Sequence, residues 1–177
     1  MMTQHPGIAK ISFTGSIATG KKIMAACAPT LKRVTLELGG NDASIVMPDV
    51  DVQTVAPQLV LGAFQNSGQV CVATKRIYIH ESIYKETLEA MSKFANNLKI
   101  GAPDDEGVNL GPIQNSMQYE RVKGFFEDVA KHEYKIAAGS KDVPNGKGFF
   151  ITPTIIDNPP NESRIIVEEP FGAYFLP

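Results

Sequence analysis

The sequence contains no tryptophan and only two cysteines, Cys27 and Cys71, among its 177 residues. Two thiols in a chain of this length do not make the disulfide framework that stabilises small secreted domains. The N-terminal residues also lack the apolar core of a secretory signal peptide. These absences favour a reduced intracellular compartment, and we expect a cytoplasmic protein.

The sequence also lacks a long apolar run and an excess of charge of one sign. No stretch approaches the roughly 20 apolar residues that a membrane-spanning helix needs. The formal net charge is -2, and the three histidines are scattered without metal-ligand partners at useful spacing. Basic residues occur in short pairs, which we interpret as solvated surface: Lys21-Lys22, Lys32-Arg33 and Lys75-Arg76. We therefore expect no nucleic-acid partner, no membrane partner and no metal site.

The pattern of apolar residues that remains predicts an α/β fold. Period-two alternation predicts strands at residues 8–14, 33–38, 43–47, 75–80, 134–138 and 149–156. Helical spacing predicts helices at residues 17–28, 82–98 and 116–132, and a further helix after Asp49 or Asp51. Pro57 is expected to kink or delay that helix, because proline has no amide proton. Alternating strands and helices indicate a mostly parallel sheet flanked by helices.

Three short segments place a reactive or flexible residue at the end of a predicted strand or helix. They are Phe13-Thr14-Gly15-Ser16, Glu37-Leu38-Gly39-Gly40 and Gly68-Gln69-Val70-Cys71. Open α/β sheets bind ligands at the ends of their strands. A thiol nucleophile with a separate carboxylate base, such as Cys71 with Glu37, is the minimum for chemistry through an acyl-enzyme.

Each of these segments also has a purely structural interpretation. Cysteines are among the most frequently buried residues, a single glutamate in a strand usually faces solvent, and Gly-Gly is usually a turn. We give Cys27 the structural interpretation, because it shares the apolar face of its predicted helix with Ile23.

The first segment also has the spacing of a phosphate-binding loop. Gly15-Ser16-Ile17-Ala18-Thr19-Gly20-Lys21 matches G-x-x-x-x-G-K, but Lys22 stands where a serine or threonine would meet magnesium. Nucleoside triphosphate chemistry is therefore not expected. A strand followed by a helix N-terminus still suits a phosphate-bearing ligand.

Together and in this order, the segments resemble the aldehyde dehydrogenase superfamily. Leu36-Glu37-Leu38-Gly39-Gly40-Asn41-Asp42-Ala43 is similar to the family's glutamate motif, and residues 64–75 are similar to its cysteine motif. Phe13-Thr14-Gly15-Ser16 is similar to the family's cofactor-contacting strand and turn, and Glu168-Glu169-Pro170-Phe171-Gly172 resembles the motif that holds the nicotinamide ribose. Two further segments fit family landmarks: Gly111-Pro112 and Phe150-Ile151-Thr152-Pro153-Thr154.

The resemblance implies that an aldehyde is oxidised to a carboxylic acid with NAD or NADP, of which we favour NAD. Cys71 is then the nucleophile that forms a thiohemiacetal and later a thioester, and Glu37 activates the water that hydrolyses the thioester. The other implied site residues bind the cofactor: Gly15 and Ser16 at the pyrophosphate, Leu38 and Gly39 along the nicotinamide, Glu169 at its ribose and Phe171 beside its ring.

The resemblance also implies that this chain is a fragment of a longer subunit. We expect residues 1–39 to be the C-terminal part of a dinucleotide-binding domain and residues 40–177 to be a C-terminally truncated catalytic domain. The full-length parent is expected to be a homo-oligomer. A fragment without half of the cofactor site and one oxyanion donor is expected to be weakly active or inactive.

Two other functions fit the same residues. One is a non-catalytic truncated paralogue, and the other is a thiol esterase that uses Cys71 and Glu37 without a cofactor. A dehydrogenase that acylates coenzyme A is a third possibility, but that class generally lacks the glutamate found here at Glu37.

Overall fold

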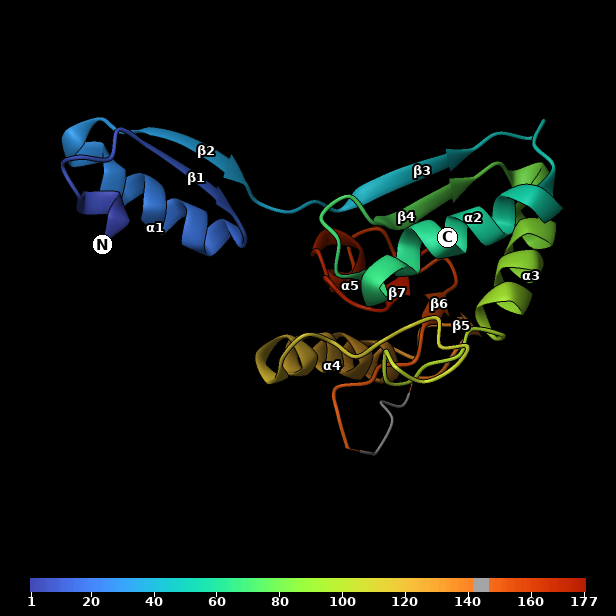
Figure 1. Ribbon diagram of the computed structural model, residues 1–177. Helices are drawn as coiled ribbons and strands as arrows, with labels where there is room; N and C mark the ends of the chain where they lie inside the picture. Colours follow the sequence, from blue (N-terminus) through green and yellow to red (C-terminus); the bar gives the residue numbers. More distant parts are fainter. Residues whose placement is uncertain (142–146) are drawn as a thin grey trace. The chain divides into compact units, whose positions relative to one another are not determined.

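The computed structural model describes residues 1–141 and 147–177, and the chain divides into two compact units, Met1–Gly40 and Asn41–Pro177 (Figure 1). Each unit combines parallel strands with helices, which confirms the predicted α/β class. The assignment of the two units to a dinucleotide-binding and a catalytic domain stays a prediction.

Unit 1 is a small strand–helix–strand motif. Its elements are η1 (Met2–Gln4), β1 (Lys10–Thr14), α1 (Ile17–Cys27), η2 (Ala28–Thr30) and β2 (Arg33–Glu37). β1 and β2 pair in parallel, with Thr14 opposite Glu37. The two strands therefore end side by side, at the point where α1 begins.

Unit 2 holds the remaining elements. In chain order these are β3 (Asp42–Val46), α2 (Val52–Phe64), η3 (Gln65–Gly68), β4 (Thr74–Ile79), η4 (Glu81–Ile83), α3 (Tyr84–Ala95), α4 (Ser116–Lys131), β5 (Ile136–Ala138), β6 (Thr154–Ile156), α5 (Arg164–Val167) and β7 (Tyr174–Phe175). β3 pairs in parallel with β4, while β6 lies between antiparallel β5 and parallel β7.

Backbone hydrogen bonds next to β7 join these two sheets. The Ile77 amide donates to the Leu176 carbonyl at 2.7 Å, and the Leu176 amide donates to the Lys75 carbonyl at 2.9 Å. β7 thus lies beside β4, and the strands follow the spatial order β3-β4-β7-β6-β5.

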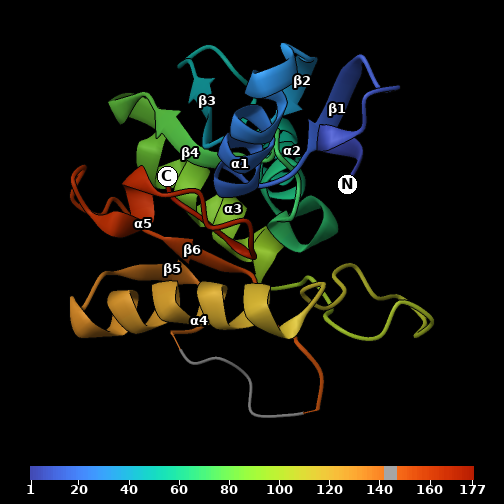
Figure 2. The same ribbon diagram turned by 90° about the vertical axis from the view of Figure 1, so that its left-hand side faces the viewer.

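Helices cover both faces of the sheet. On one face, α2 and α3 pack side by side in both views and share a buried cluster that includes Val60, Met91 and Phe175 (Figures 1 and 2). On the other face, α4 and α5 pack in a second cluster that includes Phe125 and Tyr174. Neighbouring residues of β7 enter opposite clusters, as the period-two geometry of a strand requires.

The observed elements differ from the predicted ones in several places. Of the two effects expected from Pro57, a kink or a late start, the late start is wrong. The Asp51 side chain accepts from the Gln53 amide at 3.1 Å and caps the helix at Val52, ahead of Pro57. α3 begins at Tyr84, after a short 3-10 turn. The strand predicted at residues 149–156 is shorter in the structure, where β6 spans Thr154–Ile156, and α5 and β7 were not predicted.

Among the described residues, no helix combines the length and apolar character needed to cross a bilayer.

Met91 and Met117 offer a test of the core between α2, α3 and the sheet. Met91 is fully buried in α3, whereas Met117 is 79% exposed at the start of α4. Met91→Ala should lower the free energy of unfolding by about 2–5 kcal/mol, because it removes buried apolar surface and leaves a cavity. Met117→Ala should change it by less than about 0.5 kcal/mol. Urea titration followed by circular dichroism measures both, and equal losses would contradict this core.

Candidate active site

Within unit 1, the structure brings several predicted site residues to one edge of the β1–β2 sheet. The Gly15 amide donates to the Glu37 carbonyl at 3.0 Å, so the turn after β1 is fixed against the end of β2. Ser16 caps α1, because its hydroxyl accepts from the Thr19 amide at 3.2 Å. Gly15, Ser16 and Glu37 are all exposed.

Leu38 and Gly39 continue from β2 along α1. A Cβ atom added to buried Gly20 would lie only 2.5 Å from Leu38 Cδ2, so glycine lets the Leu38 side chain pack directly on the helix. Gly39 has φ of +98°, a left-handed conformation that glycine adopts without strain. The five predicted residues of unit 1 therefore share one edge of its sheet.

This edge fits the phosphate-bearing part of a dinucleotide. The first amides of a helix have no partner within the helix, and the helix dipole favours an anion at that end. α1 follows β1 after two residues, Gly15 and Ser16, so its N-terminus faces the edge where Glu37 ends β2. Strand–turn–helix geometry of this kind binds pyrophosphate groups.

In unit 2, Cys71 follows a loop with an unusual backbone. Asn66, Ser67 and Gly68 have φ values of 51°, 57° and 75°, so three consecutive residues lie in the left-handed region. Such a run is strained for a serine and persists only where neighbouring groups hold it. The Ser67 hydroxyl supplies one such hold, because it donates to the Gly111 carbonyl at 2.7 Å.

Gln69 holds the same loop from its other side. Its side-chain nitrogen donates to the Asn66 carbonyl at 3.0 Å, and its side-chain oxygen accepts from the Gln114 amide at 2.9 Å. The side chain is 8% exposed, so these hydrogen bonds are shielded from water. Cys71 follows on the surface, and its free thiol is exposed.

Lys75 corrects the interpretation of Lys75-Arg76 as solvated surface. Lys75 is 2% exposed and lies on the inward face of β4 together with Ile77. Its ammonium donates to the carbonyls of Gly68 at 2.9 Å and Gly172 at 3.0 Å, with Ala63 at 3.5 Å. The period-two pattern with Ile77 and Ile79 was the sequence signal for this inward position.

The segment with Glu169 and Phe171 is also held by side-chain donors, both from α4. The Gln118 side chain donates to the carbonyls of Pro170 at 2.9 Å and Phe171 at 3.0 Å, and Arg121 donates to the Glu169 carbonyl at 2.9 Å. Because Lys75 contacts both Gly68 and Gly172, the structure brings this segment to the base of the Cys71 loop. Cys71, Glu169 and Phe171 thus belong to unit 2.

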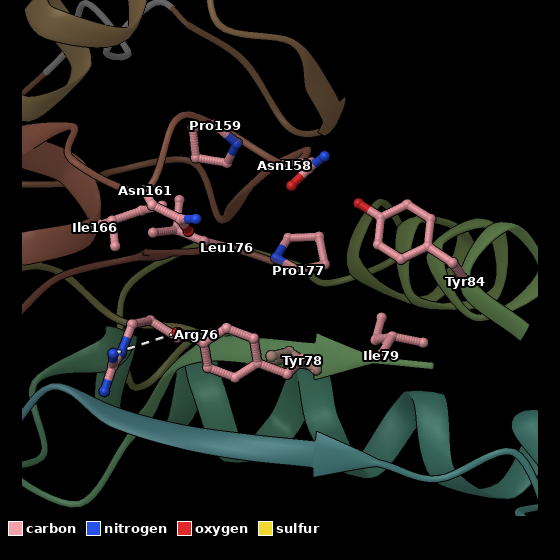
Figure 3. A pocket seen from close by; sticks show the side chains of 11 residues that line it. Arg76, Tyr78, Ile79, Tyr84, Asn158, Pro159, Asn161, Ile166, Leu176 and Pro177 are labelled. Atoms are coloured by element: carbon pink, nitrogen blue, oxygen red, sulfur yellow. Dashed lines mark hydrogen bonds between the residues drawn. The ribbon is translucent and has the colours of Figure 1, made fainter. Parts of the chain in front are cut away.

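A separate cavity of about 150 Å³ lies between β4 and the C-terminal segment (Figure 3). Its lining includes Arg76, Tyr78 and Tyr84, and the Arg76 guanidinium donates to the Tyr78 hydroxyl at 3.4 Å. None of the predicted site residues lines this cavity. Among the described residues, no group of three or more His, Cys, Asp or Glu side chains could hold a metal ion.

Two glycines test how tightly the Cys71 loop is built. A Cβ at Gly68 would lie 2.1 Å from the Gly172 carbonyl oxygen, whereas a Cβ at Gly62 in α2 meets nothing within 4 Å. Gly68→Ala should lower the free energy of unfolding by at least about 2 kcal/mol, through the clash and the left-handed φ. Gly62→Ala should raise it by up to about 1 kcal/mol, because alanine is the better helix former. Denaturant titrations that rank the two variants in the opposite order would contradict this loop.

The buried ammonium predicts a pH dependence of stability. Burial lowers the pKa of Lys75 from 10.5 to about 8, although the negative charge of Glu169 opposes the change. Between these two pH values the unfolded chain binds more protons than the folded chain, so the free energy of unfolding rises with pH. The penalty of holding the ammonium is fully present below pH 8 and is relieved above pH 10.5.

Comparison with Lys75→Met isolates this effect from other groups that titrate at high pH. The free energy of unfolding of the unchanged chain, relative to that of Lys75→Met, should increase by at most about 3 kcal/mol between pH 8 and pH 10.5. Urea titrations of both proteins in buffers that span the window measure the difference. A difference that stays constant with pH would contradict the assignment.

Comparison with known proteins shows what this arrangement belongs to. The profile of the aldehyde dehydrogenase family matches residues 1–175. The chain is 42% identical over 172 residues to the chloroplastic aminoaldehyde dehydrogenase ALDH10A8 of Arabidopsis thaliana. This match covers 97% of this chain and 34% of that protein. The chain therefore spans about a third of the length of the curated relatives that it matches.

Two solved structures have the same fold. One is a cysteine-to-alanine mutant of aldehyde dehydrogenase C from Pseudomonas syringae with NAD+ and octanal, with a TM-score of 0.93, 34% identity, and coverage of 99% of this chain and 36% of that chain. The other is a betaine aldehyde dehydrogenase double mutant from Staphylococcus aureus with NAD+ and a BME-modified cysteine, with a TM-score of 0.91, 30% identity, and coverage of 99% and 36%. By its sequence and its fold, this chain belongs to the aldehyde dehydrogenase family.

Proposed function

We propose that this chain carries the nucleophile and water-activating base of an NAD(P)-dependent aldehyde dehydrogenase. The observation that carries the proposal is the exposed Cys71 thiol behind a strained loop that buried Ser67, Gln69 and Lys75 side chains hold in place. A backbone held away from its relaxed conformation is common where a reactive group has to be presented in one orientation.

Cys71 attacks the aldehyde carbon as the thiolate, and a carbon–sulfur bond forms while the carbonyl π electrons move to oxygen. The negative oxygen of this thiohemiacetal needs a hydrogen-bond donor in a fixed position. The backbone amide of Cys71 is the proposed donor. On either side of it, the Gln69 amide donates to Asn66 at 3.1 Å and the Ala73 amide donates to Val70 at 3.0 Å, so the backbone around it is fixed.

Glu37 completes the reaction as a general base. The thioester on Cys71 is hydrolysed when a water molecule loses a proton to the carboxylate and attacks the acyl carbon. The thiolate leaves and the carboxylic acid is released. The Glu37 carboxylate is exposed at the end of β2, and its backbone is held by Gly15.

The residues that would bind the cofactor lie in both units. Ser16 and Gly15 offer the N-terminus of α1 to the pyrophosphate, and Leu38 and Gly39 border the nicotinamide. Glu169 accepts hydrogen bonds from the ribose, and Phe171 flanks the ring. When bound, the nicotinamide supplies the hydride acceptor. The relatives whose structures contain NAD+ support NAD rather than NADP as the first cofactor to test.

The substrate is proposed to be an uncharged or cationic aldehyde. Two matched proteins are named for aminoaldehyde and betaine aldehyde, and one was solved with octanal. The absence of nucleic-acid and membrane partners and a homo-oligomeric parent stay predictions. The cytoplasmic location also stays a prediction, since relatives named as chloroplastic and mitochondrial are among the matches.

The reactivity of Cys71 tests the proposal. Limiting iodoacetamide should alkylate Cys71 in the folded chain about tenfold faster than in the urea-unfolded chain, as expected of a thiol that the fold presents as a nucleophile. Mass spectrometry of the peptides containing Cys71 and buried Cys27 measures both rates. A slower reaction in the folded chain than in the unfolded chain would show an ordinary surface thiol, as expected of a non-catalytic paralogue.

A nitrophenyl ester distinguishes the esterase alternative. The dehydrogenase proposal predicts an acyl adduct on Cys71, absent from Cys71→Ala, and slow aldehyde-dependent reduction of added NAD. In Glu37→Gln this reduction should stop after about one equivalent, because the thioester is no longer hydrolysed. Cys27→Ala is the control with an unchanged active thiol. Continuous ester turnover at a rate that does not depend on NAD, without any aldehyde oxidation, would favour the thiol esterase.

A further inference from the structure

Lys75 is a buried cation of unit 2 to which the proposed mechanism assigns no chemical step. A lysine with 2% exposure is rare unless its charge is compensated. Here the ammonium has three N–H donors and meets three backbone carbonyls, those of Ala63, Gly68 and Gly172. Every donor of the group is therefore used on the backbone.

The three carbonyls belong to separate parts of the chain. Ala63 is in the last turn of α2, Gly68 ends η3 just before Cys71, and Gly172 follows Phe171. Lys75 and Gly172 are 97 positions apart in the sequence. The space between Gly68 and Gly172 is so tight that a Cβ on Gly68 would overlap both the Gly172 oxygen and the Lys75 ammonium.

Other contacts hold each segment separately. Ser67 and Gln69 tie the Cys71 loop to residues 111–114, while Gln118 and Arg121 tie residues 169–171 to α4. Of the side-chain hydrogen bonds described here, those of Lys75 reach both segments at once. Glu169 adds a charge interaction with the same ammonium.

We propose that Lys75 is a positioning residue that holds the Cys71 loop in register with the Glu169–Phe171 segment, through one ammonium bound to the Gly68 and Gly172 carbonyls. The inference rests on the proposed function, in which Cys71 meets a carbonyl carbon and Glu169 meets the nicotinamide ribose. A reaction between a bound aldehyde and a bound nicotinamide requires these two segments to keep a fixed spacing.

Three variants test the proposal. Lys75→Met removes the charge and all three donors at similar volume, and Lys75→Arg keeps a charge with several donors. Lys99→Met is the matched control, because exposed Lys99 also donates to a backbone carbonyl, that of Glu106 at 2.6 Å, away from both segments. Each variant is compared with the unchanged 177-residue chain.

Amide hydrogen exchange measures directly whether Lys75 couples the Cys71 loop to the Glu169–Phe171 segment. In Lys75→Met, peptides over residues 66–73 and 170–176 should both exchange about tenfold faster, while peptides of α3 keep the original rate. Lys99→Met should leave both regions unchanged, and Lys75→Arg should restore most of the protection. Faster exchange in one region alone, or equal acceleration along the whole chain, would overturn the proposal.

Alkylation of Cys71 separates positioning from simple structural support. The thiol is already exposed, so a loss of stability alone does not improve its access to reagent. Alkylation of Cys71 in Lys75→Met should be about threefold slower, because the loop that presents the thiol loses its hold on Gly68. Lys75→Arg keeps a charged donor for the carbonyls and should stay within about twofold of the unchanged chain. A lower melting temperature with an unchanged Cys71 rate would make Lys75 purely structural and overturn the proposal.

The two proposals fail in different measurements. The proposed function fails if Cys71 of the unchanged chain reacts more slowly folded than unfolded, a result that involves no Lys75 variant. The positioning role fails if exchange at residues 66–73 and 170–176 does not change together, whatever the reactivity of Cys71.

Discussion

The pairing of β4 with β7 determines where the functional segments of unit 2 lie. Parallel strands that lie side by side begin at the same edge of a sheet, and the Ile77–Leu176 hydrogen bond of 2.7 Å sets that register. The Cys71 loop precedes β4, and the segment of Glu169 and Phe171 precedes β7. Both therefore arrive at the N-terminal edge of the sheet. In unit 1 the arrangement is reversed, because Gly15 and Leu38 follow the C-terminal ends of their strands.

The same pairing makes β7 a central strand despite its two residues. Phe175 enters the cluster under α2 and α3, and Tyr174 enters the cluster under α4. Phe64 at the end of α2 contacts Phe175 with ring centroids 5.0 Å apart. The helix that leads into the Cys71 loop is thus anchored on the strand that follows the Glu169 segment. Core packing and site geometry depend on one short strand.

The sequence predicted most of the regular elements but few of the long-range contacts. β1, α1, β2, β3 and β4 lie within two residues of their predicted bounds, because alternation and caps are local signals. α5 and β7 are too short for such signals. Cys71 and Glu37 were identified from local motifs, but the role of Lys75 depends on Gly172, far along the chain. Lys75 was assigned to the surface because a charge outweighed its inward position beside Ile77.

Unit 1 has very little interior of its own. Of residues 1–40, only Gly20 and Cys27 are buried, and a segment of about 40 residues rarely folds stably on so small a core. Its opening is therefore expected to require much less free energy than the opening of unit 2, so the chain does not unfold in a single cooperative step. The Cys27 thiol is a native reporter of that sub-global opening, placed by the sequence within the less stable of the two units.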